Sequence, residues 1–436
     1  MTLLVTSSSA SVVRAESGEV TTTPTVTGVN SIEGADVWQS PSRKPRIEAA
    51  FAHESYRSGS VAKLVIFSKA ARDVSVQLFR AGTEDAAISA RDEMSGTPAS
   101  EVRQLGVERK NQCIWVPIPH APSGLYFAKL TGAGRRVGYA PFILRPQYFG
   151  NHQVALVLPT LTWQAYNRHD DDGDGQADTW YANPKITSVR LARPFDQRGV
   201  PPNYKWYDEP FLRWLISTGK SLDYLSQSDL ASTNGRRLAA AYGLLIFSGH
   251  HEYVTRDEYN AVEGFRNRGG NLMFLSANNF FWRVAVRHNR MSRIAKWRDI
   301  GRPEAALVGV QYIGNDGGTH RDAYHVRHTE AASWLFAGTG LANGLSFGWA
   351  FGIEIDKSAT SSPRDIRVLA DLPNLFGPGK TGQMTYYKKG RAKVFAAGAF
   401  GLVDNMQSQA VDVMMENLWA KFSKPPLARW RPHPRQ

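Results

Sequence analysis

The sequence predicts an α/β protein in which a doubly wound, mostly parallel sheet follows a small β-sandwich. Short alternating apolar runs, separated by turn residues, fill the chain up to residue 146. Beyond Pro146, continuous apolar runs alternate with helical segments, a pattern typical of parallel sheets. The 436 residues are enough for a buried core in each part.

The first pattern predicts an immunoglobulin-like β-sandwich over residues 45–146. Its expected strands are Val61–Phe67, Val74–Arg80, Cys113–Ile118, Leu125–Leu130 and Val137–Leu144. Residues 1–44 are polar and rich in Ser, Thr and Gly, and we expect them to be mobile. Cys113 is the single cysteine, so neither an internal disulfide nor a thiolate metal cluster can form. Its place in an apolar run predicts a buried, inert thiol.

The second pattern predicts an α/β domain over residues 147–425, with a flavodoxin-like or glutamine-amidotransferase-like parallel sheet. Val154–Pro159, Leu244–Phe247 and Asn271–Ser276 are apolar runs suited to strands buried on both faces. A helix that is capped by Thr255 and runs to Arg268 separates the last two runs. Ligands bind beyond the carboxyl ends of such strands. Gly249–Glu252 and Ala277–Asn278 occupy those ends.

The chain carries a net charge of +13. Its Lys and Arg residues are scattered apart from a basic tail over residues 426–436, and no nucleic-acid-binding motif accompanies them. We therefore expect a solvated basic surface without a nucleic-acid partner. No stretch reaches the length of a membrane span. The Ser/Thr-rich segment that ends at Thr27 is typical of the region after a processed leader. The N-terminus does not decide between compartments, but a calcium site in the acidic loop described below would favour an exported protein, periplasmic or extracellular, over a cytoplasmic one.

The segment Ser248–Tyr253 follows an apolar strand directly. His250 and Glu252 are two residues apart on this loop, so both side chains can point into one cleft. A helix-capping loop with solvated polar side chains is the alternative interpretation.

Several motifs occur in a fixed order along the chain. They are Ser123–Tyr126, Pro159–Asn167, His250–Tyr253, Gly269–Asn278 and Phe281–Trp282. In this order they resemble the C-terminal domain of the large (beta) subunit of N,N-dimethylformamidase, and the resemblance extends to about Trp419. That subunit carries a further lectin-like domain and works with a separate small subunit.

The resemblance implies an amidohydrolase with one iron ion. The implied iron ligands are Tyr126, Tyr166 and Glu252. His250 would act as acid/base and Asn278 as a polar support beside the metal. Glu354, in Gly352–Asp356, would be a catalytic carboxylate, with a surface-loop acid as the alternative. The alternative for each tyrosine is a core aromatic with a hydrogen-bonded hydroxyl.

The chemistry of this residue set is coherent. Two phenolates and a carboxylate are hard, anionic oxygen donors, which suit Fe3+ better than Zn2+. A metal lowers the pKa of bound water toward about 7, so hydroxide could attack an amide carbonyl while His250 protonates the departing amine. The expected function is hydrolysis of a small amide or formamide C–N bond, by a homo-oligomer or with a small subunit. Whether the chain is an enzyme is left open. A non-catalytic, calcium-stabilised envelope or ligand-binding protein of the same fold is the alternative.

An acidic loop provides the second metal motif. The aspartates that match positions 1, 3, 5 and 9 of a calcium loop are Asp170, Asp172, Asp174 and Asp178. Position 12 is Tyr181, where an EF-hand has a bidentate Glu, so the match is to a partial loop. The sequence predicts Ca2+ here, with a solvated acidic loop as the alternative.

Overall fold

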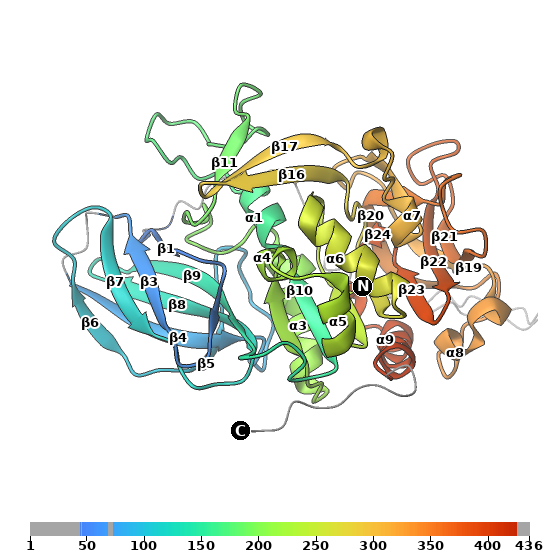
Figure 1. The fold of residues 1–436 in the computed structure, drawn as a ribbon, viewed down its shortest axis with the longest axis horizontal. Helices are drawn as coiled ribbons and strands as arrows, with labels where there is room; N and C mark the ends of the chain where they lie inside the picture. The colour runs from blue at the N-terminus through green and yellow to red at the C-terminus, as the bar shows by residue number, and fades with distance from the viewer. Residues whose placement is uncertain (1–43, 45, 69–72, 425–436) are drawn as a thin grey trace, which may run out of the picture. The chain divides into compact units, whose positions relative to one another are not determined.

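The computed structural model describes residues 44, 46–68 and 73–424. Two sheets face each other over one apolar core in the first part of the chain, drawn in blue and teal in Figure 1. The smaller sheet has the order β1-β3-β7, with β1 (Ala49–Phe51), β3 (Val61–Ile66) and β7 (Gln112–Pro117). The larger has the order β2-β9-β8-β4-β5, with β6 beside β4. Its strands are β2 (Ser55–Arg57), β4 (Asp73–Ala81), β5 (Gly96–Pro98), β6 (Arg103–Gly106), β8 (Gly124–Gly132) and β9 (Arg136–Arg145).

A further, eleven-stranded sheet begins with five parallel strands in the order β12-β10-β13-β15-β23. They are β10 (Val154–Leu158), β12 (Asp223–Ser226), β13 (Leu244–Phe247), β15 (Asn271–Phe274) and β23 (Ala392–Ala396). Every residue of the first four is buried. This agrees with strands that are covered on both faces.

The same sheet continues from β23 with antiparallel strands in the order β22-β21-β19-β20-β18, and β24 pairs with β20. They are β18 (Gln311–Asn315), β19 (Arg321–Val326), β20 (Ser346–Lys357), β21 (Arg367–Leu372), β22 (Gly382–Lys389) and β24 (Ala399–Phe400). The predicted doubly wound, mostly parallel fold is therefore wrong. The described chain holds more residues in strands than in helices, in large mixed and antiparallel sheets and a β-sandwich.

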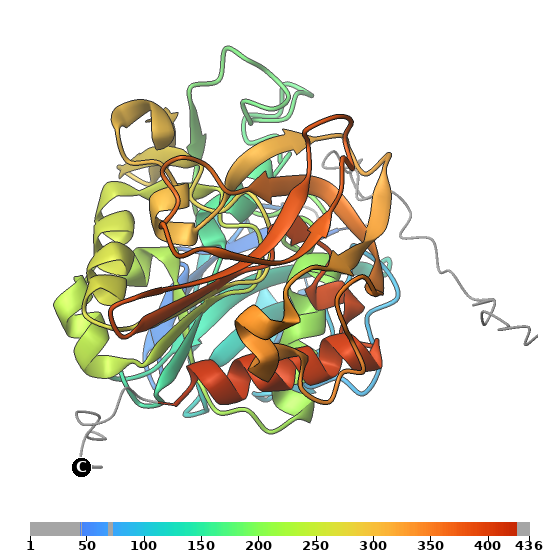
Figure 2. The same cartoon turned by 90° about the vertical axis from the view of Figure 1, so that its right-hand side faces the viewer.

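Helices cover both faces of the parallel strands. Leu156 and Ile246 share a core with α3 (Glu209–Ser217) and α9 (Gln409–Phe422). Val157 and Phe247, one residue further along, share the other core with α5 (Gly235–Ala241), α6 (Arg256–Asn267) and α7 (Ala305–Val308). Figure 2 shows α6 and α9 on opposite sides of the sheet. The remaining helices are α1 (Thr160–Tyr166), α2 (Tyr204–Tyr207), α4 (Gln227–Ala231) and α8 (Ser333–Phe336).

Local sequence signals explain where several helices begin. Thr255 caps α6, since its side chain accepts a hydrogen bond from the backbone N–H of Glu258, as predicted. Ser226 and Asp229 form a reciprocal capping box at the start of α4. Single 3-10 turns lie at Arg298–Ile300, Thr329–Ala332 and Val403–Asn405.

A four-stranded sheet, ordered β11-β17-β16-β14, lies next to α1 and α6 in Figure 1. Its strands are β11 (Ser188–Arg190), β14 (Tyr253–Thr255), β16 (Trp282–Arg287) and β17 (Arg290–Lys296). β14 begins one residue after Glu252 and pairs in parallel with β16. This small sheet thus fixes the backbone that follows each of the predicted site loops.

Cys113 is exposed, so the prediction of a buried thiol is wrong. β7 is an edge strand, and the alternation of side chains turns Cys113 and Trp115 to solvent while Val116 is buried. The predicted mobile segment 1–44, apart from Lys44, and the basic tail 426–436 lie outside the described residues. The described residues belong to one compact unit, so the domain boundary after residue 146 stays a prediction. None of the helices they form is both long and apolar enough to cross a membrane.

Candidate functional site

The candidate site lies where three neighbouring parallel strands end. α1 follows β10, the loop with His250 and Glu252 follows β13, and Asn278 follows β15. β10, β13 and β15 are adjacent in the sheet, so their carboxyl ends meet at one edge. The antiparallel strand β20 brings Glu354 and Asp356 to the same place. The structure thus brings together most of the residues that the sequence singled out, although the fold class differs from the predicted one.

Two phenols share one carboxylate oxygen at this edge. The Tyr166 hydroxyl donates to Oε2 of Glu252 at 2.7 Å, and the Tyr181 hydroxyl donates to the same oxygen at 3.2 Å. The two tyrosine rings stack with their centroids 4.6 Å apart. The hydroxyls of Tyr181 and Tyr253 are also hydrogen-bonded, and Trp180 Nε1 donates to Tyr253 at 3.2 Å. The result is a buried cluster of phenols around Glu252.

His250 lies between two carboxylates. Its Nε2 is 3.5 Å from Oε2 of Glu252 and 3.3 Å from Oε2 of Glu354. Asn315 Nδ2 donates to the other oxygen of Glu354 at 2.8 Å. Glu354 is only 3% exposed, so it is not the surface-loop acid of the alternative interpretation. Among the described residues, His250 is the one basic side chain that forms an ion pair with Glu252 or Glu354.

Ile353 and Asn278 have left-handed backbone conformations that help to position the site. Ile353 has a φ of 62°, which is unusual for a β-branched residue, and β20 is irregular between Gly352 and Ile355. This irregularity directs Glu354 toward His250. Asn278 has a φ of 53°, and its backbone N–H donates to both carboxylate oxygens of Asp356 at 2.9 and 3.0 Å. Its own Oδ1 is buried and has no hydrogen-bond partner among the described residues.

The electrostatics of the cluster follow from burial. Burial raises the pKa of Glu252 to about 7; the charge of His250 opposes this rise and that of Glu354 adds to it. Burial likewise raises the pKa of Asp356 to about 8. Burial and the charge of Glu252 raise the pKa of Tyr166 and of Tyr181 well above the usual value of phenol. Acidic side chains thus outnumber basic ones here, and further positive charge would be stabilised.

The structure does not bring Tyr126 to this cluster. Tyr126 lies in β8, where its hydroxyl donates to the backbone oxygen of Pro122 at 2.9 Å and its ring stacks on Phe142. Its ring belongs to the core of the β-sandwich. Tyr181 occupies the place beside Glu252 instead. In the sequence Tyr181 stands out only as position 12 of the acidic loop, and no pattern marks its place beside the carboxylate.

The acidic loop lies between Tyr166 and Tyr181 in the sequence. The carboxylates of Asp170, Asp172 and Asp174 each place one oxygen within 4.8 Å of the others. Asp178 turns inward, where its Oδ2 accepts from the backbone N–H of Asp171 at 2.6 Å. Ca2+ in this loop stays a prediction. Because the loop links Tyr166 to Tyr181, its conformation bears on the phenol cluster.

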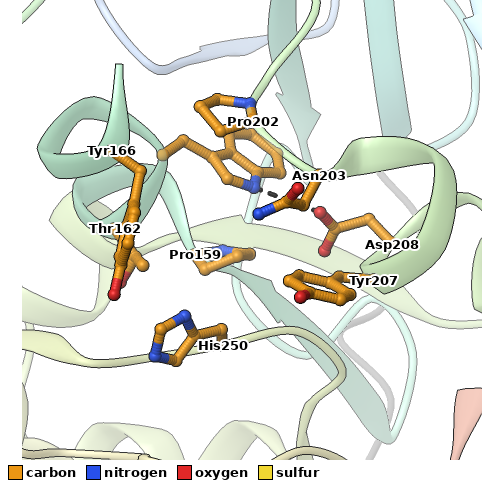
Figure 3. A pocket seen from close by; sticks show the side chains of 9 residues that line it. Pro159, Thr162, Tyr166, Pro202, Asn203, Tyr207, Asp208 and His250 are labelled. Atoms are coloured by element: carbon orange, nitrogen blue, oxygen red, sulfur yellow. Dashed lines mark hydrogen bonds between the residues drawn. The ribbon is translucent and has the colours of Figure 1, made fainter. Parts of the chain in front are cut away.

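A pocket of about 270 Å³, measured to its open mouth, adjoins the cluster. Its lining residues are Pro159, Thr162, Trp163, Tyr166, Pro202, Asn203, Tyr207, Asp208 and His250. Figure 3 shows Tyr166 and His250 on one side of this pocket and Asp208 on the other. Tyr207 and Asp208 were not predicted from the sequence. The segment Tyr207–Pro210 resembles an ordinary helix start, and nothing in the sequence shows that it faces His250.

Comparison with known proteins assigns the chain to a family. The family model for "N,N-dimethylformamidase beta subunit-like, C-terminal" matches residues 75–412. The chain belongs to this family. The match confirms the resemblance based on the motif order, and within the family an amidohydrolase-type function is the coarse expectation. No curated protein matched the sequence.

Solved structures gave only distant likenesses. A cycloisomaltooligosaccharide glucanotransferase from Paenibacillus sp. is 13% identical, with a TM-score of 0.17, over 29% of this chain and 17% of that chain. A CARDB domain from Pyrococcus furiosus is 10% identical, with a TM-score of 0.15, over 25% of this chain and 95% of that chain. A beta-glucosidase from Listeria innocua is 10% identical, with a TM-score of 0.16, over 24% and 16%. These scores are too low to indicate a common fold, and the chain spans less than a fifth of the two enzymes.

Proposed function

We propose that the protein is a metal-dependent amidohydrolase that cleaves the C–N bond of a small linear amide. The observation that carries this proposal is the convergence of Tyr166 and Tyr181 on Glu252, with His250 beside them at a pocket. A buried carboxylate surrounded by phenols and a second carboxylate is expensive to maintain unless it balances a cation. Membership of the dimethylformamidase-like family supports the same reaction class.

The residues fit an iron ion on two grounds. Two phenol oxygens already lie within hydrogen-bond distance of one carboxylate oxygen, which gives three oxygen donors in one place. The protons that these phenols donate are the ones a cation would displace, because a nearby metal ion stabilises the phenolate form. Such hard, anionic oxygens prefer Fe3+ to softer ions. Tyr166, Tyr181 and Glu252 would hold the ion, with Tyr181 in the role first predicted for Tyr126.

When bound, iron would supply a Lewis acid that polarises a carbonyl and lowers the pKa of water. The side chains of the protein would deliver the proton that the departing nitrogen needs. In hydrolysis, water adds to the carbonyl carbon, the C–N bond breaks, and the nitrogen leaves as a neutral amine after gaining one proton. We assign the delivery of that proton to Nε2 of His250. Glu354, 3.3 Å away and held by Asn315, would orient the imidazole and keep it protonated.

Metal analysis of protein purified without chelator tests this proposal. We expect about one equivalent of iron and a visible absorption band from phenolate-to-iron charge transfer, together with release of ammonia from formamide or of an amine from its N-methyl derivatives. Colourless, iron-free protein that hydrolyses none of these amides would contradict the proposal. That result would favour a non-catalytic binding protein that keeps only the acidic loop as a metal site. Export of the protein, and its assembly as a homo-oligomer or with a small subunit, are further proposals.

A further inference from the structure

Two buried polar atoms without partners face the pocket beside His250. Oδ1 of Asp208 and the hydroxyl oxygen of Tyr207 are both inaccessible to solvent and make no hydrogen bond within the described residues. Asp208 is only 1% exposed. A buried donor or acceptor without a partner carries its full desolvation cost, so such atoms are rare unless something else satisfies them. Figure 3 shows the Asp208 carboxylate pointing into the pocket.

The Asp208 side chain is held so that only one oxygen is available. Trp163 Nε1 donates to Oδ2 at 3.1 Å, which fixes the plane of the carboxylate. Oδ1 faces Gly249, and a Cβ at position 249 would approach it to 2.7 Å. Glycine at 249 therefore leaves the space that Oδ1 occupies. The backbone of Asp208 joins α2 to α3, so the carboxylate rests on a rigid corner.

The two unpartnered groups have complementary chemistry. Burial raises the pKa of Asp208 to about 7, so above that pH its carboxylate is ionised and its oxygens only accept hydrogen bonds, whereas a tyrosine hydroxyl can donate one. An amide that has hydrogen on its nitrogen offers one N–H donor and one carbonyl acceptor. A tertiary amide such as N,N-dimethylformamide offers the acceptor alone. Its binding would leave Oδ1 of Asp208 buried and unsatisfied.

We propose that this pocket selects amides with an N–H on the scissile nitrogen, with Oδ1 of Asp208 accepting that hydrogen and the Tyr207 hydroxyl donating to the carbonyl oxygen. This inference rests on the proposed amidohydrolase function and names its substrate class. Primary and secondary amides are accepted, and tertiary amides are discriminated against. A site whose buried polar group bonds to the substrate strongly rejects an analogue that lacks the bonding hydrogen. An apolar pocket discriminates much less between substrates that differ by one methyl group.

Asp208→Asn tests the inference directly. The Trp163 donor will attract the oxygen of the new carboxamide and so turn its NH2 group to the position of Oδ1, which replaces an acceptor by a donor. We would measure kcat/KM for N-methylformamide and for N,N-dimethylformamide from the methylamine or dimethylamine released. Wild type should prefer N-methylformamide by about tenfold or more, and Asp208→Asn should bring the ratio close to one. The loss should fall on N-methylformamide, with N,N-dimethylformamide changed by less than about threefold.

Asp196→Asn is the matched control, since Asp196 is also buried but lines a neighbouring pocket without Asp208 or His250. It should keep the wild-type ratio. Tyr207→Phe should lower kcat/KM for both amides alike, because both have a carbonyl oxygen. Equal use of the two amides by wild type, or an equal loss of both in Asp208→Asn, would overturn the inference while leaving the hydrolase proposal intact.

Binding measured by ligand-observed NMR with the same two amides separates the two proposals. If neither amide is hydrolysed, the hydrolase proposal fails. The assignment of the pocket is then tested only by whether N-methylformamide binds more tightly than N,N-dimethylformamide. Weaker binding of N-methylformamide to Asp208→Asn than to wild type and Asp196→Asn would support it. Identical binding to all three proteins would contradict it. If Asp208→Asn does not fold, the Tyr207→Phe variant and the wild-type preference still test the assignment.

Discussion

The hydroxyl of Tyr166 donates to Oε2 of Glu252 at 2.7 Å, joining residues 86 positions apart in the chain. Tyr166 ends α1 and Glu252 lies in the loop between β13 and β14, so this bond connects the segments that follow two adjacent parallel strands. Both side chains are buried. A hydrogen bond between a buried phenol and a buried carboxylate is the arrangement that a metal ion can convert into two ligands by displacing one proton.

Tyr166→Phe tests whether this phenol is a metal ligand or a core aromatic. The substitution keeps the ring and removes the oxygen, so we expect iron content and the visible band to fall to near zero. The free energy of unfolding of the iron-free proteins should change by no more than about 1 to 2 kcal/mol. Iron analysis and urea unfolding measure both effects. A variant with wild-type iron and colour would make Tyr166 a structural residue.

Tyr181→Phe and Tyr126→Phe form a matched pair for the second phenol. Both tyrosines have hydrogen-bonded hydroxyls, but only Tyr181 contacts Glu252. We expect Tyr181→Phe to lose most of the iron and Tyr126→Phe to retain it. The opposite result, loss of iron in Tyr126→Phe alone, would restore the ligand set implied by the family resemblance.

Glu252→Gln and His250→Gln should fail in different ways. Loss of the Glu252 carboxylate removes an anionic ligand, so iron should be lost together with activity. His250→Gln should keep the iron and its colour but reduce amide hydrolysis by about a hundredfold or more, since it removes the proton donor. Parallel measurements of iron content and amine release distinguish these outcomes. Loss of iron in both variants would place His250 among the ligands.

The acidic loop gives a prediction about calcium. Asp172→Ala combined with Asp174→Ala should lower the melting temperature only when Ca2+ is present, because a ligand of the native state stabilises it by mass action. Differential scanning fluorimetry with Ca2+ and with chelator measures the difference. Equal melting of the wild-type protein under both conditions would identify the loop as a solvated acidic turn. Because the loop links Tyr166 to Tyr181, bound Ca2+ should also slow the loss of iron to a chelator.

Glu209 predicts how stability depends on pH away from the site. Burial, with the charge of Glu84, raises the pKa of Glu209 to about 7, against an ordinary value of 4.5. Between these pH values the folded protein keeps a proton that the unfolded chain has released. This contribution to stability is therefore complete below the unfolded pKa and is lost as pH rises through about 7.

Glu209→Gln cannot ionise, so it should gain stability relative to wild type between about pH 5 and about pH 8. Urea unfolding at the two pH values measures the change. Glu101→Gln, at an exposed position, is the control and should follow wild type at both. A constant difference between Glu209→Gln and wild type would show that this carboxyl ionises normally in the folded protein.

The sequence predicted which residues come together better than it predicted the fold. The runs that became β10, β13 and β15 are continuously apolar, and their polar ends had to meet once the strands were parallel. Strands such as β18 and β19 have mixed burial and short apolar runs, so nothing in their sequences indicates a large antiparallel sheet. These antiparallel strands, which were not predicted, make the fold mostly β and the predicted fold class wrong.

Side-chain partners were predictable only where a motif fixed them. His250 and Glu252 lie on one loop, and their meeting with Tyr166 follows from adjacent strands. Tyr181 reaches Glu252 because the intervening acidic loop folds back, which depends on its own hydrogen bonds. Asp208 belongs to no motif, and only its packing against Trp163 and Gly249 reveals the unpartnered oxygen.

The left-handed backbone of Ile353 has a consequence for protein engineering. Replacing Ile353 by Gly would relieve backbone strain of about 1 to 3 kcal/mol, less the packing lost with the side chain. The same change would loosen the bulge that directs Glu354 toward His250. Ile353 is buried, and the loss of its packing costs about 2 to 5 kcal/mol, so selection for heat resistance and selection for turnover should both retain isoleucine at this position. Stabilised versions of the protein are best sought elsewhere in β20.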